Sequence, residues 1–111
     1  MRYLISGKII KGDGYGKKIG FPTVNLETKN NLPPVGVYVG MGILDGKEYR
    51  AGIVMGPNDK IEAHLLKYEG NAYGKSVTLE VKNFLRKYKK FKNEADLIKQ
   101  IKSDIELIAN S

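Results

Sequence analysis

The sequence predicts a mainly β protein, in which about six short antiparallel strands close into a small barrel and one α-helix follows them. Three observations lead to this fold class. Runs of β-branched and aromatic residues recur between turn residues, thirteen glycines supply tight turns, and hydrophobic residues adopt a helical spacing only near the C-terminus. We expect closure into a barrel because it removes the edges that an open sheet of this size would expose.

The first two predicted strands lie on either side of a glycine-rich loop. Residues 3–10 form the first strand, and the loop runs from Gly12 to Gly16. The second strand is the segment FPTVNL at residues 21–26. Pro22 confines this segment to a strand start or an edge, because proline has no N–H to donate to a neighbouring strand.

The middle of the chain carries the clearest turn signal. After a loop at residues 28–34, two strand-like runs at residues 35–44 and 47–55 flank Asp45-Gly46. This pair of residues is typical of a two-residue β-hairpin loop. Residues 56–59, Gly-Pro-Asn-Asp, predict a further turn.

Two more strands are predicted from alternation. In residues 60–68 every second position is hydrophobic at first, which predicts one buried face and places Glu62 and His64 together on the other. A loop follows at residues 70–74. Residues 76–84 alternate in the same way, and the residues directed to one side are Val77, Leu79 and Val81.

The C-terminal segment is predicted to be a helix. Its apolar residues recur at helical spacing and are Leu97, Ile98, Ile101, Ile105 and Ile108. Asn93 is the expected N-cap, with Asp96 three residues later as a variant of the capping box. Because the helix has a single apolar stripe, we expect it to pack on the outside of the sheet.

Length and composition limit the possible functions. The chain has 111 residues, so we expect one domain over residues 1–111. It has no cysteine, which excludes disulfides, thiol nucleophiles and cysteine-based zinc sites. The net charge of +7 favours an anionic partner, either a nucleic acid, a nucleotide or a phosphorylated substrate. No segment reaches the ~20 apolar residues that span a membrane, so we expect a cytoplasmic protein without a membrane partner.

The glycine-rich loop suggests phosphate binding without matching a standard phosphate motif. Neither the Walker A pattern nor the dinucleotide-binding pattern is satisfied around Gly12, Gly14 and Gly16, and no βαβ unit is predicted there. The loop and the adjacent Lys17 and Lys18 could present backbone N–H groups and charge to an anion. The alternative is a barrel turn followed by two solvated lysines.

Three further features admit both a structural and a functional interpretation. Thr23 and Asn25 share a strand face and offer two neutral oxygen ligands to a cation such as Mg²⁺, or they are an ordinary strand Thr and a turn Asn. Glu62 could act as a general base oriented by His64, or both could be surface residues. The basic run at residues 85–92, which contains two aromatic rings, could bind nucleic acid or connect two elements.

In order along the chain, these segments resemble the riboflavin kinase domain from Gly7 to the final helix. The most specific part is GFPTVNL at residues 20–26, which is similar to the family motif G-[FI]-P-T-A-N-[LF]. Further segments follow in the family's order, namely Glu62-x-His64, Tyr73-Gly74, Leu85-Arg86 and the tail from Phe91 to Asp104.

The resemblance implies a six-stranded antiparallel Greek-key barrel that phosphorylates the 5′-hydroxyl of riboflavin with ATP, giving FMN and ADP. It implies that Thr23 and Asn25 bind Mg²⁺, with Zn²⁺ or Mn²⁺ as alternatives, and that Glu62 takes the proton from the hydroxyl. The loop from Gly12 to Lys18 would cover the nucleotide phosphates, and Arg86 would lie beside the flavin and phosphate. The residues expected to bind nucleotide or flavin are Gly12, Gly14, Tyr15, Gly16, Lys17, Lys18, Pro22 and Arg86.

Several expectations complete this interpretation. The partners are riboflavin or FMN and ATP or ADP, without nucleic acid, and the protein is a monomer. We expect Met1 to be a native start, with an excised domain as the alternative. The given residues show no nucleotidyltransferase segment, so we expect FMN synthesis without FAD synthesis. Two alternatives remain: a small basic barrel that binds single-stranded nucleic acid, and a non-catalytic flavin-binding domain. The second would follow if segment 54–62, which is shorter than in the family, disables the site.

Overall fold

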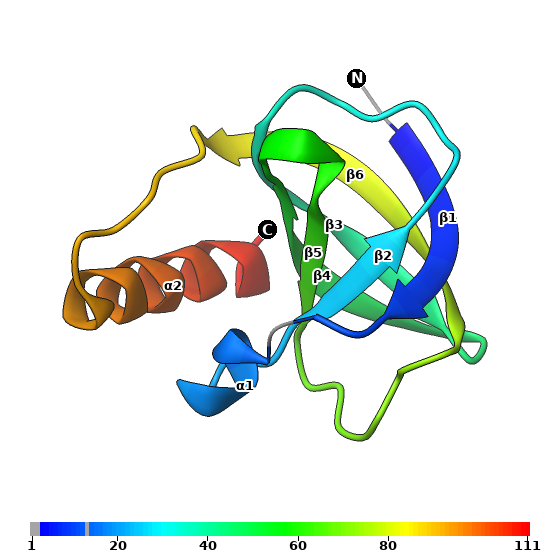
Figure 1. Ribbon diagram of the computed structural model, residues 1–111, viewed down its shortest axis with the longest axis horizontal. Helices are drawn as coiled ribbons and strands as arrows, with labels where there is room; N and C mark the ends of the chain where they lie inside the picture. The colour runs from blue at the N-terminus through cyan, green and yellow to red at the C-terminus, as the bar shows by residue number, and fades with distance from the viewer. Residues whose placement is uncertain (1–2, 13) are drawn as a thin grey trace.

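Six antiparallel strands close into a barrel in the computed structural model, which describes residues 3–12 and 14–111 (Figure 1). The strands are β1 (Tyr3–Ile10), β2 (Val24–Glu27), β3 (Gly36–Leu44), β4 (Lys47–Met55), β5 (Ile61–Leu65) and β6 (Ser76–Arg86). Around the barrel they follow the order β1-β2-β5-β4-β3-β6. Strands β3, β4 and β5 are consecutive neighbours and β6 returns beside β3, which is a Greek key. The predicted fold class is confirmed.

The predicted turns and strand faces are also found. Asp45 and Gly46 have φ values of 52° and 76°, as a tight hairpin with a mirror-image turn requires. The inward residues of β5 and β6 are buried, and Glu62 and His64 lie together on the outward face of β5 as expected. Strand β5 ends at Leu65, earlier than predicted, and Lys67 shortly beyond it has a φ of 66° that breaks the extended chain.

Two short helical segments lie where only turns were predicted. The single turn α1 (Tyr15–Lys18) occupies the end of the glycine-rich loop, and the 3-10 turn η1 (Pro57–Asp59) joins β4 to β5. Gly14, with a φ of 74°, starts α1 in a conformation that glycine adopts without strain. A helix of one turn has no hydrophobic period, so alternation and spacing could not reveal it. Asp13 of the same loop lies outside the described residues.

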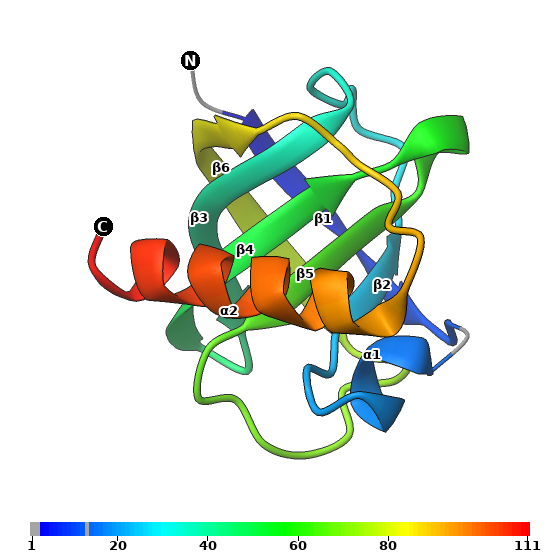
Figure 2. The same cartoon turned by 90° about the vertical axis from the view of Figure 1, so that its left-hand side faces the viewer.

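The C-terminal helix α2 (Glu94–Ala109) lies against the outside of the barrel, across β4 (Figures 1 and 2). Its predicted N-cap is present, because the Asn93 side chain accepts a hydrogen bond from the backbone N–H of Asp96 at 2.9 Å. The two elements are in close contact near the helix C-terminus, where a Cβ atom on Gly52 would lie 2.7 Å from Ile108. No helix among the described residues is long and apolar enough to cross a membrane.

Candidate active site

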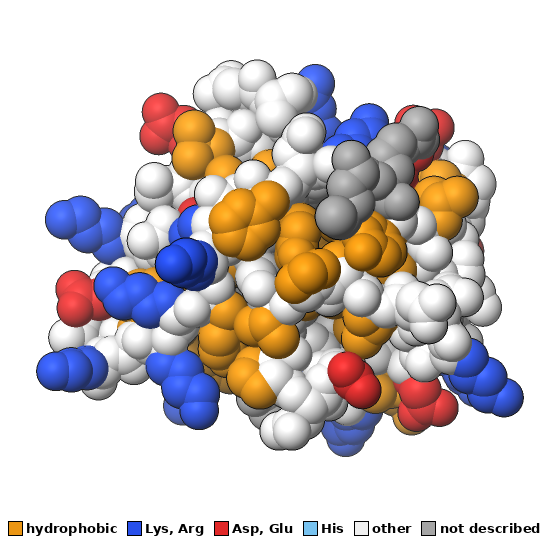
Figure 3. Space-filling view, turned by 90° about the horizontal axis from the view of Figure 1, so that it is seen from above, with side chains coloured by type: hydrophobic (Ala, Val, Ile, Leu, Met, Phe, Trp, Pro, Cys, Tyr) orange, Lys and Arg blue, Asp and Glu red, His pale blue; other side chains and the backbone are white. Residues whose placement is uncertain are grey.

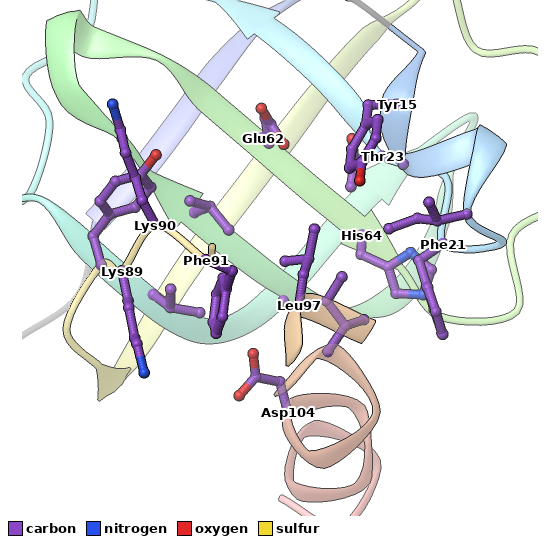
Figure 4. Close-up of a pocket in the computed structure, with 18 of the residues that line it drawn as sticks. Tyr15, Phe21, Thr23, Glu62, His64, Lys89, Lys90, Phe91, Leu97 and Asp104 are labelled. Atoms are coloured by element: carbon purple, nitrogen blue, oxygen red, sulfur yellow. The ribbon is translucent and has the colours of Figure 1, made fainter. Parts of the chain in front are cut away.

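Two hollows adjoin on the outer surface of the barrel. The first is a cavity of about 560 Å³ between α2, the connector at residues 87–93 and the outward faces of β4 and β5 (Figure 4). The second is a groove of about 780 Å³ lined by residues 10–12, 25–33 and 58–61. Strands β2 and β5 pair with each other and lie between the two hollows. The outward residues of these strands therefore lie where the hollows meet.

The predicted metal ligands and the predicted base lie at this boundary. Asn25 is paired directly with Glu62 across β2 and β5, so both side chains project from the same outward face. Asn25 lines the groove, whereas Glu62 and Thr23 line the cavity. In Figure 4, Glu62 lies in front of β5, with Thr23 to one side of it. The barrel therefore brings together the three residues that the motif resemblance selects.

Two glycines of the loop permit close packing against the segment that carries Thr23 and Asn25. A Cβ atom on Gly12 would lie 2.1 Å from the side-chain nitrogen of Asn25, and one on Gly16 would lie 2.5 Å from the carbonyl oxygen of Phe21. A larger side chain at Gly16 would collide with backbone, whereas one at Gly12 would require the Asn25 side chain to move. These glycines thus allow the loop backbone to lie close to the predicted metal ligands. The sequence spacing alone does not show this need for glycine.

The remaining loop residues have different surroundings. Lys17 and Lys18 are exposed at the end of α1 and line neither hollow, and Gly14 is exposed at its start. Tyr15 lines the cavity, and its hydroxyl donates to the Glu94 carboxylate at 3.1 Å. This hydrogen bond raises the pKa of the Tyr15 phenol above its ordinary value. It also links the loop to the first turn of α2 across one side of the cavity.

His64 holds the segment before β2 in place. Its Nδ1–H donates to the carbonyl oxygen of Pro22 at 2.7 Å, since a carbonyl can only accept. Its ring also meets Phe21 edge-on, with centroids 6.3 Å apart. The hypothesis that His64 orients Glu62 therefore needs correction, because the hydrogen bond runs to Pro22 and so supports the approach to Thr23. Pro22 itself is exposed.

Glu62 has a cationic neighbour that the sequence analysis did not select. The ammonium of Lys60 lies 3.0 Å from the Glu62 carboxylate, and the Glu62 side chain is 29% exposed. Among the described residues no group of three or more acidic or histidine side chains forms a metal site. The acidic charge at this boundary is thus balanced by a lysine.

Arg86 anchors the helix in the structure. Its Nε and Nη2 atoms donate to the Asp104 carboxylate at 2.9–3.1 Å, and Nη1 donates to the Lys87 carbonyl. Asp104 is buried and also accepts a hydrogen bond from Gln100. Arg86 does line the cavity, but each of its three guanidinium nitrogens donates to a partner within the protein. The sequence analysis named Asp104 only as the end of the family pattern and not as the partner of Arg86, although an aspartate within the apolar stripe of the helix was a usable signal.

The basic run forms part of the cavity wall. Tyr88 and Phe91 line the cavity, and the ammonium of Lys89 lies 5.3 Å from the centre of the Phe91 ring. Seen from above, hydrophobic side chains gather in the middle of the face, and lysine and arginine lie mainly around its edge with some acidic residues (Figure 3).

Comparison with known proteins gives a consistent result. The flavokinase family model, described as riboflavin kinase, matches residues 1–111. The chain is 34% identical over 113 residues to a bifunctional riboflavin kinase/FMN adenylyltransferase of Haemophilus influenzae, and 31% identical over 114 residues to one of Bacillus subtilis. The matches cover 94% and 92% of this chain and 37% and 36% of those proteins.

A solved structure shares the fold over almost the whole chain. The crystal structure of a macrolide-efflux protein from Streptococcus pneumoniae has a TM-score of 0.93 and 27% identity, and the match covers 97% of this chain and 38% of that one. The chain spans little more than a third of the length of the curated relatives described above. The family match nevertheless extends over every residue. The chain belongs to the riboflavin kinase family.

Proposed function

We propose that this protein transfers the γ-phosphoryl group of ATP to the 5′-hydroxyl of riboflavin, which gives FMN and ADP. One observation carries the proposal: Thr23, Asn25 and Glu62 meet on one outward face where the two hollows adjoin. A phosphoryl acceptor in one hollow and a donor in the other would then have their reacting groups beside Glu62. The family membership of the chain supports the same reaction.

The cavity suits the flavin ring. Its volume of about 560 Å³ lies within the usual range for small-ligand sites. One wall is the apolar stripe of α2, the opposite wall is the outward face of β4, and Tyr88 and Phe91 add aromatic surface. A planar, largely apolar ring would bury its faces between these walls and leave a polar side chain free to extend toward Glu62.

The groove suits the nucleotide. Its lining is mixed and includes the basic and polar residues Lys11, Lys29, Asn30 and Asn31 as well as the acidic residues Glu27 and Asp59. The loop backbone at Gly12 approaches Asn25 at the end of the groove nearest the cavity. Phosphates placed there would lie beside the predicted cation ligands.

The side chains at the boundary fit a hard divalent cation. Thr23 offers a hydroxyl oxygen and Asn25 an amide oxygen, which Mg²⁺ accepts when phosphates supply the charge and water completes its coordination. Mn²⁺ and Zn²⁺ are alternatives. A bound cation would neutralise charge on the phosphates during transfer.

The reaction makes modest demands on the protein. The 5′-oxygen of riboflavin forms a bond to the γ-phosphorus, the bond from that phosphorus to the bridging oxygen breaks, and its electron pair leaves with ADP. Glu62 accepts the hydroxyl proton. A carboxylate is a much weaker base than an alkoxide, so the proton moves late, as the new bond forms. Alignment and charge neutralisation supply most of the rate increase.

The proposal is tested by incubating the full chain with riboflavin, Mg²⁺ and ATP and measuring FMN by chromatography. We expect ATP-dependent FMN formation. If no nucleoside triphosphate yields FMN, the kinase proposal is wrong. Riboflavin binding without turnover would then support a non-catalytic flavin-binding domain, and tight, salt-dependent binding of an oligonucleotide would support the nucleic-acid alternative.

Replacing Asn25 with alanine should raise the Mg²⁺ concentration needed for half-maximal activity. The variant removes one of the two neutral oxygens and leaves Thr23 alone on the protein side. The measurement is a Mg²⁺ titration of FMN formation at saturating substrates. Asn71→Ala is the matched control, because Asn71 lies in the loop before β6 and bonds the backbone of Tyr73. An unchanged Mg²⁺ titration for Asn25→Ala would remove Asn25 from the metal site.

A further inference from the structure

Lys60 occupies the boundary between the two hollows. Among the described residues it is the one that lines both the cavity and the groove. Its ammonium lies 3.0 Å from the Glu62 carboxylate, although its side chain is 55% exposed. We propose, resting on the kinase function above, that Lys60 is a further catalytic residue, which binds the phosphoryl group as it passes from the groove to the cavity.

The backbone around Lys60 is fixed while its side chain is exposed. The carbonyl of Lys60 accepts a hydrogen bond from the Gly56 N–H at 2.7 Å, and its own N–H donates to the Pro57 carbonyl at 3.4 Å. The residue therefore closes the turn that contains η1 and leads directly into β5. The turn therefore holds the backbone of Lys60 in a defined position beside the site. The long, flexible side chain can then place its ammonium at Glu62 or at a nearby phosphoryl oxygen.

Every other described cation lines at most one of the two hollows, Lys11 and Lys29 the groove and Lys90 and Lys92 the cavity. Arg86 donates from its guanidinium to Asp104 and the Lys87 carbonyl. Lys17 and Lys18 line neither hollow. Lys89 lies over the Phe91 ring. Lys60 is thus the described cation that combines a position at the boundary with direct contact to the proposed base.

The chemistry explains why a cation is needed at this point. During transfer, negative charge is carried by the three outer oxygens of the γ-phosphoryl group, and Glu62 stands nearby as a carboxylate. A carboxylate and a phosphoryl group repel each other unless positive charge lies between them. The Lys60 ammonium has three donor protons, which allows it to bridge carboxylate and phosphoryl oxygens. It carries no proton to the substrate, and the hydroxyl proton still goes to Glu62.

The test compares three variants of the full chain. Lys60→Gln should lower kcat by about 10²-fold, the size of effect seen when one fixed donor to a developing charge is removed. The KM for riboflavin should stay the same, and Lys60→Arg should recover much of the lost rate because it keeps the charge. Lys82→Gln is the matched control, because Lys82 pairs with Glu80 two positions away on β6 at 3.5 Å and lines neither hollow. It should behave as the unaltered chain.

A binding measurement separates this inference from the proposed function. Calorimetric titration with ADP and with a non-hydrolysable ATP analogue, both with Mg²⁺, should show that Lys60→Gln weakens binding of the analogue about tenfold and leaves ADP binding unchanged. If the unaltered chain makes no FMN, the proposed function fails and this comparison still decides whether Lys60 meets the third phosphate. Equal losses for ADP and the analogue, or none, would overturn the role of Lys60, as would a kcat equal to that of Lys82→Gln.

Discussion

Replacing Glu62 with glutamine should lower kcat for FMN formation by about 10² to 10⁴-fold, the usual contribution of a general base. Glutamine keeps the volume of the side chain but cannot accept the hydroxyl proton. The side chain lies on a rigid strand directly opposite Asn25, so the change should leave the surrounding structure in place. Steady-state kinetics at saturating riboflavin and ATP measure the effect, and both KM values should change little.

The control for this experiment is Glu48→Gln, an exposed carboxylate near the start of β4 that lines neither hollow. It should have normal kinetics. Calorimetric binding of riboflavin and ADP to Glu62→Gln checks that the site remains folded. Near-normal turnover of the Glu62 variant would show that another group, or water, accepts the proton.

Replacing Asp104 with asparagine should destabilise the protein by about 3 kcal/mol, at the lower end for a broken buried ion pair because Arg86 remains partly solvated. The Asp104 side chain is 10% exposed and that of Arg86 is 23% exposed. The variant leaves the guanidinium without its carboxylate and weakens the link between β6 and α2. Urea unfolding monitored by circular dichroism measures the free energy of unfolding.

The double variant Arg86→Met with Asp104→Leu is the informative comparison. Removing both charges together leaves no unpaired ion, so we expect it to recover a large part of the lost stability. Riboflavin binding should weaken in Asp104→Asn, because α2 forms a wall of the cavity, whereas ADP binding in the groove should not. If the free energy of unfolding of Asp104→Asn lies within about 0.5 kcal/mol of that of the unaltered chain, the substitution behaves as an ordinary surface change. The ion pair would then not anchor the helix.

Local patterns in the sequence were sufficient for most of the fold. Alternation identified the buried faces of β5 and β6, Asp45-Gly46 identified the central hairpin, and Asn93 identified the start of α2. These features depend on neighbours in the chain, which a single sequence displays. The turn α1 was missed because its backbone hydrogen bonds form within one helical turn and leave no repeating pattern.

The arrangement of the candidate site could be predicted only in part. Resemblance selected Thr23, Asn25 and Glu62, but no spacing rule could place Asn25 opposite Glu62, because that register depends on which strands become neighbours in the closed barrel. The same limit applies to His64, whose partner is the carbonyl of Pro22. Arg86 was expected at the ligand, yet its partner Asp104 lies within the apolar stripe of α2, and only the packing of α2 on the barrel brings the two residues together.

The pairing of β2 with β5 also has a consequence for folding. Strand β2 pairs with β1, and β5 pairs with β4, so these strands belong to two regions that can each form through contacts closer in sequence. The regions join through β2 with β5 and through β1 with β6. Both pairings close long loops, an entropically costly step that is expected to occur late during folding. The two halves of the site therefore meet only when the barrel closes. Recovery of enzymatic turnover during refolding should thus report the final closure rather than the earlier growth of β-structure.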